Sequence, residues 1–138
     1  MALGFTAVLQ RNRLDEITAL MDAGAGAARL RIYDGTRATN ADTALGAQVL
    51  LAELDFSATS FPAATGTPGT MSANAITDEA SAPAAGTATW FRIVDDATGV
   101  VMDGDVATAA SDLNLNSTAI SIGIRVSVSQ FDLTAGNQ

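Results

Sequence analysis

The stretch Gly86–Asp105, GTATWFRIVDDATGVVMDGD, decides the fold that we expect. Its first half alternates along an extended chain, so that Trp90 and Arg92 point to one side and the residues between them to the other. The polar link Asp95–Gly99 has the length of a hairpin connection and ends in glycine, which readily adopts positive φ. A second apolar run, Val100–Met102, follows. The pattern predicts an antiparallel hairpin that carries the only tryptophan of the chain.

Alternating apolar and polar residues predict further strands on both sides of this hairpin. One segment is ambiguous, because Ala44–Leu54 also has the composition of a helix. We favour a strand there, since the alternation continues through Phe56. The expected strands besides the hairpin are Ala27–Tyr33, Gln48–Phe56, Met71–Thr77, a short segment around Leu113 and Leu115, and Thr118–Leu133 with a bulge near Ser129–Gln130.

The sequence predicts one helix, Arg11–Asp22. Asn12 can cap its N-terminus, and the acidic residues Asp15 and Glu16 suit the positive end of the helix dipole. Glycines at positions 24 and 26 would end the helix. The apolar face, which we expect to pack against the sheet, consists of Leu14, Ile17, Leu20 and Met21.

The length of 138 residues predicts a single domain that buries about two-thirds of its unfolded surface. About seven strands separated by turn signals, with one short N-terminal helix, are typical of a mainly β fold, an antiparallel β-sandwich or barrel. We expect an N-terminal arm at residues 1–10, the domain at 11–135 and a frayed tail at 136–138. Ser57–Thr70 contains two prolines and is expected to be a long loop.

Composition excludes several classes of function. The chain has 15 acidic residues and seven basic residues, which gives a net charge of −8. All seven basic residues are arginines. Nucleic acids and anionic membrane surfaces attract clustered positive charge, so neither is an expected partner. Without cysteine or histidine there is no disulfide, Cys/His zinc site or histidine triad, and without lysine there is no P-loop. The N-terminus lacks a secretory signal pattern and no apolar run is long enough to span a bilayer, so we expect synthesis and retention in a cytoplasm.

Four aspartates flank the expected hairpin, at positions 95, 96, 103 and 105. Oxygen-rich loops bind calcium, but the spacing here differs from the calcium-loop pattern. Two acids can also hydrolyse a glycosidic bond, yet the chain has few aromatic residues on which a sugar could stack. We therefore expect no metal site, no cofactor and no catalytic residue, and we interpret Asp95, Asp96, Asp103 and Asp105 as residues that form turns.

Five residues are candidate contacts with a partner protein. Arg29, Arg31 and Tyr33 share one face of their expected strand, and Trp90 and Arg92 share one face of theirs. Arginine binds carboxylates through two parallel bonds, and exposed Trp and Arg are enriched at interface hot spots. Two alternatives stay open: the arginines could only solvate an outer sheet face, and Trp90 could be buried beneath the N-terminal helix.

Five segments carry a family resemblance: RLDEI at 13–17, LRIYDG at 30–35, LLAEL at 50–54, TWFRIV at 89–94 and DLNLN at 112–116. With these segments the chain resembles small virion proteins encoded by tailed bacteriophages, over about residues 10–135. Many members of that family have a proline just after the Asp-Gly-x-Arg stretch, whereas Ala38 follows Arg37 here. We expect this difference to affect only the stiffness of the local loop.

The resemblance implies a capsid cement, or decoration, protein. Such a protein is a small jelly-roll that binds the outside of an HK97-type shell, which implies the major capsid protein as partner, a homo-oligomer and a place on the virion surface. The arm at 1–10 and the loop Ser57–Thr70 would then order against neighbouring capsid subunits. The alternatives are a tail or head–tail joining protein, a carbohydrate-binding β-sandwich with Trp90 as its platform, and, third, an aspartate-dependent hydrolase.

Overall fold

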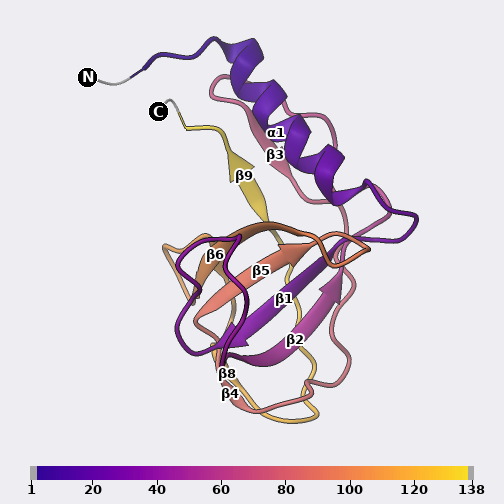
Figure 1. Cartoon of the computed structure of the whole chain (residues 1–138), viewed down its shortest axis with the longest axis vertical. Helices are drawn as coiled ribbons and strands as arrows, with labels where there is room; N and C mark the ends of the chain where they lie inside the picture. Colours follow the sequence, from indigo (N-terminus) through magenta and orange to yellow (C-terminus); the bar gives the residue numbers. More distant parts are fainter. Residues whose placement is uncertain (1–2, 137–138) are drawn as a thin grey trace.

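The protein is mainly β with one helix, as a computed structural model describing residues 3–136 shows (Figure 1). The outermost residues of the expected arm and tail, 1–2 and 137–138, lie outside the described residues. The elements in chain order are α1 (Ala7–Met21), β1 (Arg29–Asp34), β2 (Val49–Asp55), β3 (Thr70–Ser72), β4 (Gly86–Thr87), β5 (Trp90–Val94), β6 (Val100–Ala107), β7 (Leu113–Asn114), β8 (Ala119–Ile120) and β9 (Asp132–Thr134).

A five-stranded sheet in the order β2-β1-β5-β6-β7 forms the body and curls into a half-barrel (Figure 1). The first four strands are antiparallel, whereas β7 runs parallel to β6. Two small ribbons, β3–β9 and β4–β8, complete the β structure of the described residues. The expected mainly β fold is confirmed. The sheet is mixed, however, so the expectation of a purely antiparallel arrangement is wrong.

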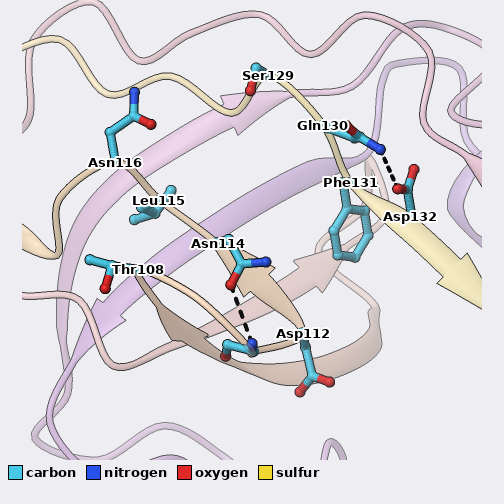
Figure 2. A pocket seen from close by; sticks show the side chains of 10 residues that line it. Thr108, Asp112, Asn114, Leu115, Asn116, Ser129, Gln130, Phe131 and Asp132 are labelled. Atoms are coloured by element: carbon cyan, nitrogen blue, oxygen red, sulfur yellow. Dashed lines mark hydrogen bonds between the residues drawn. The ribbon is translucent and has the colours of Figure 1, made fainter.

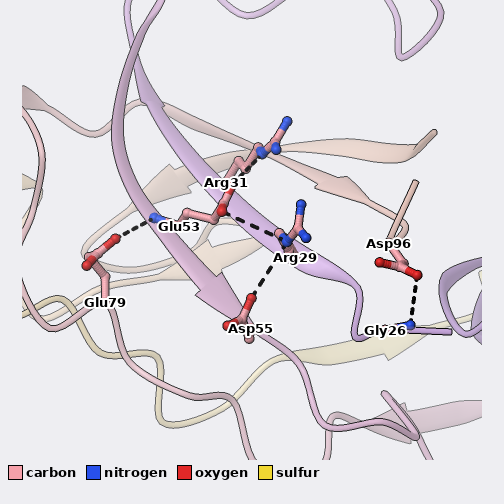
Figure 3. Close-up of polar contacts among 7 residues, drawn as sticks. All are labelled: Gly26, Arg29, Arg31, Glu53, Asp55, Glu79 and Asp96. Carbon is pink, nitrogen blue, oxygen red and sulfur yellow. Dashed lines mark hydrogen bonds and ion pairs between the residues drawn. The ribbon is translucent and has the colours of Figure 1, made fainter. Parts of the chain in front are cut away.

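The expected hairpin is the β5–β6 pair, and its link is Asp95–Gly99. The residue with positive φ is Thr98, at 72°, and not Gly99 as predicted. Glycine is needed at position 99 for a different reason. The N–H of Gly99 donates to the Asp95 carboxylate at 2.6 Å, and a Cβ added to Gly99 would lie only 2.7 Å from that carboxylate. The neighbouring Asp96 accepts from the N–H of Gly26 at 2.8 Å, which ties the link to the turn before β1 (Figure 3).

The helix begins four residues earlier than predicted. Thr6 is the N-cap, since its hydroxyl accepts a hydrogen bond from the N–H of Leu9 at 3.3 Å, and Asn12 lies inside the helix. Residues 7–10 of the expected arm are therefore helical. Two acids hold the loop after β2: Asp15 of α1 accepts from the N–H of Ala64, and Asp22, the C-cap of the helix, accepts from that of Ser60. The helix thus packs beside β3 and that loop (Figure 1) and also contacts β6 of the large sheet.

The C-terminal segment is the main error of the sequence-based prediction. Instead of one strand over Thr118–Leu133, only its ends, β8 and β9, are strands. A turn interrupts it, because Gly123 has a φ of +82° and the N–H of Ile124 donates to the carbonyl of Ser121. Val126 makes one isolated bridge, with Glu79. The expected strand Met71–Thr77 is likewise reduced to β3. Of the alternating apolar side chains, Ile120, Val126 and Val128 are buried without a continuous ladder, whereas Ile122 and Ile124 are exposed.

One hydrophobic core connects the parts of the molecule. It includes the inner face of the large sheet, the buried side of α1 and a group of contacting phenylalanines. Within the described range 3–136, no helix combines the length and the apolar character that crossing a membrane requires. The aromatic and helical contributors to the core are Leu14, Met21, Phe56, Phe61, Phe91 and Phe131.

Candidate interaction surface

The structure brings the five predicted contact residues together. Strand pairing sets Arg31 opposite Arg92 and Tyr33 opposite Trp90, and Arg29 lies next along β1 on the same side. We call these five residues the arginine face. It is the face of the sheet opposite the core, because the intervening residues of both strands belong to the core cluster. The shared face was predictable from alternation, whereas the contact between the two strands was not.

Two arginines of this face pair with the edge strand β2 (Figure 3). The Arg31 Nε lies 2.6 Å from a carboxylate oxygen of Glu53, its cross-strand neighbour. The Arg29 Nε lies 3.9 Å from both Glu53 and Asp55. All four side chains remain partly exposed. Since such exposed pairs contribute little to stability, these arginines remain available to a partner.

The other three residues of the arginine face form a buried stack. The rings of Tyr33 and Trp90 are nearly parallel, with an interplanar angle of 18° and centroids 4.7 Å apart. The Arg92 guanidinium lies 5.5 Å from the Trp90 ring centroid. It also makes two bonds to Asp103, of 2.7 and 2.8 Å. Stacking and the cation–π contact join two aromatic residues and a buried ion pair into one unit.

The loop between β1 and β2 covers this stack; in Figure 1 it passes in front of β5 and β6. The Arg92 Nη1 donates to the Thr43 carbonyl at 3.1 Å, and Arg37 pairs with Asp105 at 3.0 Å. Trp90 is consequently 0% exposed. Burial of Trp90 is one of the alternatives that the sequence leaves open. The segment that covers it is this loop, however, and not the N-terminal helix. A direct contact of Tyr33, Trp90 or Arg92 with a partner would require the loop to move.

On the pKa values of both Tyr33 and Arg92, burial and neighbouring charges act in opposite directions. Burial raises the pKa of Tyr33 above its ordinary value, while the neighbouring Arg31 and Arg92 partly counteract this. The pKa of Arg92 is raised, chiefly because its hydrogen bonds to Asp103 stabilise the charged form. The tyrosine is therefore neutral and the arginine charged throughout the physiological range.

Each of the seven arginines has a partner within the chain. Besides those of the sheet, Arg11 donates to the Gly66 carbonyl at 3.1 Å, Arg13 lies over the Phe5 ring and Arg125 pairs with Asp78. The hydrogen bonds of Asp78 to Ser127 and Arg125 lower its pKa. The positive charge of the chain is thus largely matched internally. The excess of acidic residues leaves the surface with a net negative field.

The four hairpin aspartates have separate structural partners. Asp95 binds Gly99, Asp96 binds Gly26, and Asp103 and Asp105 pair with arginines of the face and the loop. Across residues 3–136, the structure contains no group of three acidic side chains arranged to hold a metal ion. Their predicted role in shaping turns holds for Asp95 and Asp96.

A polar hollow of about 450 Å³ lies where β7 meets the segment before β9 (Figure 2). Carboxylates, side-chain amides and hydroxyls form most of its wall. Sequence reasoning missed this site, although the alternating DLNLN segment carries two of its amides and could have been a signal. The residues lining this polar hollow are Thr108, Ser111, Asp112, Asn114, Leu115, Asn116, Ser129, Gln130, Phe131 and Asp132.

Comparison with known proteins gives no further assignment: the chain matches no protein-family model, no curated protein and no solved structure.

Proposed function

We propose that this chain is a non-enzymatic structural protein of a tailed-phage virion, which binds the outside of the capsid and cements the shell. The observation that carries the proposal is the resemblance of the five segments between residues 13 and 116 to small phage virion proteins. Kinship with jelly-roll cement proteins, a homo-oligomeric state and the major capsid protein as partner are parts of the same proposal.

The distribution of apolar side chains on the surface supports a role in protein contact. Leu3, Val8, Leu9 and Leu20 are exposed at the end of the molecule where α1 lies. We call these four residues the apolar end. Single exposed apolar side chains are normal on a protein surface, so it is their number on and just before α1 that makes this end a candidate contact for another protein. A capsid lattice multiplies weak contacts, so each copy can bind modestly and still reinforce the shell.

Copy number is the most direct test of the proposal. A cement protein occupies sites that scale with the icosahedral lattice, whereas a tail or head–tail joining protein forms a ring of few copies. Quantitative mass spectrometry of purified virions should give a ratio to the major capsid protein near a simple lattice fraction. A ratio corresponding to one ring per particle would favour the joining protein instead, and absence from virions would overturn both.

A surface variant tests the apolar end directly. Removing residues 1–10 would also delete the Thr6 cap and the first turn of α1, so point substitutions are the cleaner experiment. We expect Leu9→Glu combined with Leu20→Glu to reduce occupancy on capsids while the fold is kept, because both side chains are exposed. Leu45→Glu, on the loop over the arginine face, is the control at an equally exposed position. Equal occupancy of both variants would exclude the apolar end as the contact.

Burial of Trp90 removes the observation that favoured a carbohydrate-binding module. An aromatic platform must expose a ring face to the sugar, and the Trp90 ring is covered by Tyr33, Arg92 and the β1–β2 loop. We therefore do not propose that function.

A further inference from the structure

We propose that the polar hollow of Figure 2 receives an arginine side chain of a partner protein. The inference goes beyond the cement function and does not depend on it, because it names the chemistry of a contact whatever protein supplies it. It rests on the composition of the wall, on the internal hydrogen bonds that hold its acceptors and on the charge balance of the whole chain.

The wall of the hollow is rich in hydrogen-bond acceptors. It contains the carboxylates of Asp112 and Asp132, three side-chain amides and several hydroxyls, and its ten lining residues include no basic side chain. Phe131 and Leu115 supply the apolar part. The volume of about 450 Å³ lies within the range of about 300–1,000 Å³ that is usual for small-ligand sites.

Internal hydrogen bonds fix these acceptors in place. Asp112 accepts from the N–H of Asp105 at 2.9 Å, and Asn114 accepts from that of Ser111 at 3.2 Å. Asp132 accepts from the side-chain amide of Gln130 (Figure 2). Within the described part of the chain, the bonds of both aspartates involve only Oδ2. The two Oδ1 atoms can therefore accept hydrogen bonds from a ligand at little cost in reorganisation.

The chain itself shows which cation suits such a set of acceptors. Arg92 is bound by two bonds to Asp103 and one to a carbonyl oxygen, beside an aromatic ring. The hollow offers carboxylate and amide oxygens with Phe131 beneath them, and lacks the guanidinium. A guanidinium has five donors in a planar fork, so it matches several acceptors better than an ammonium does. The aliphatic part of the side chain can lie on the apolar wall.

Charge balance indicates that the cation comes from another molecule. All seven arginines have partners within the chain, and there is no lysine. A second copy of the protein carries the same net charge of −8 and is therefore repelled, and even its weakly paired Arg29 and Arg31 would have to leave their acidic partners. The occupant is therefore an arginine of a different, more basic protein.

Titration with a capped amino acid tests the proposal on the full chain. We expect N-acetyl-argininamide to shift the NMR signals of the side-chain amides of Asn114, Asn116 and Gln130 in a saturable way. N-acetyl-citrullinamide, which has the same shape but is neutral, should leave these signals unchanged. Equal shifts with both compounds, no shift with either, or equal affinity for N-acetyl-lysinamide would overturn the assignment to arginine.

Matched aspartate variants locate the binding. Asp132→Asn should weaken N-acetyl-argininamide about tenfold, since a hydrogen bond to a charged group is lost while the size of the side chain is kept. Asp42→Asn removes the same charge from the β1–β2 loop and should leave the affinity unchanged. An equal loss in both variants would indicate a response to net charge alone and would overturn the site. Unchanged backbone signals far from position 132 verify that the variant is folded.

Discussion

At the scale of single residues, the internal use of arginine is the most informative feature. Arg92 is 4% exposed and Asp103 is 6% exposed, so this pair is desolvated. The Arg125 side chain, which pairs with Asp78, is 72% exposed. When one member of a buried pair is removed, the other remains as an unpaired charge in the interior. When one member of an exposed pair is removed, water solvates the residue that remains. Two ion pairs of the same chemistry should therefore differ greatly in their effect on stability.

We expect Arg92→Met to lower the free energy of unfolding by about 3–5 kcal/mol, because Asp103 is left buried without its partner. Arg125→Met is the matched control and should cost less than about 1 kcal/mol. Urea unfolding monitored by circular dichroism measures both. A similar small loss for the two variants would contradict the buried character of the Arg92 pair.

Tyr33 gives a prediction about pH. Its folded-state pKa is raised by burial, so folding favours the neutral phenol. The corresponding stability is fully present below the unfolded pKa of about 10 and is lost as the pH rises through the folded pKa. Because it is the only tyrosine, the ultraviolet absorbance of the phenolate reports on this group alone. We expect a titration midpoint above 10 in the folded protein that falls towards about 10 in urea; the same midpoint in both states would contradict the burial.

At the scale of secondary-structure elements, the contact between β5 and β6 depends on a glycine. Gly104 lies opposite Phe91, and an added Cβ would come within 2.4 Å of the phenylalanine ring. That ring is fixed, because it also makes an edge-to-face contact with Phe131. The close approach of strand and ring therefore leaves no space for a methyl group.

We expect Gly104→Ala to lower the free energy of unfolding by about 1–3 kcal/mol through overpacking. Gly4→Ala is the control, since nothing lies within 4 Å of the added atom at that position. Thermal unfolding measures the difference. If both substitutions are neutral, Phe91 has room to move and the packing is looser than the structure indicates.

At the scale of the whole molecule, the helix with its small ribbon and the half-barrel share one core. Leu14 and Met21 of α1 belong to the same cluster of buried residues as Phe91 and Ile93 of the sheet. Asp96 further ties the β5–β6 link to the turn that follows the helix. Parts that share buried surface in this way lose their stability together.

We expect one cooperative unfolding transition. Fluorescence of Trp90, the only tryptophan, reports on the stack beneath the loop, while far-ultraviolet circular dichroism reports on the helix and the sheet. The two curves should coincide in urea. An earlier transition in fluorescence alone would show that the β1–β2 loop opens separately from the core.

Local patterns in the sequence were sufficient to predict the β5–β6 hairpin, β1, β2 and the existence of one helix. In β1 the alternation matches the burial as far as Ile32. In β5 every residue is buried, because the β1–β2 loop covers the outer face of that strand, and Leu20 of the expected helical face is exposed. The same reasoning failed for Thr118–Leu133, where Val126 and Val128 are buried without a neighbouring strand of matching length. It also set the helix start too late, because both Thr6 and Asn12 are capping residues and only one can be used.

The sequence by itself determined that this protein is mainly β, acidic, and without cysteine, histidine or lysine, since composition and alternation are properties of the chain alone. Only the tertiary structure decided that the arginine face is largely closed by a loop, and that the polar hollow forms between β7 and the segment before β9. The physical reason is that both features join residues distant in the chain. Local periodicity gives the direction of a side chain but not what lies over it.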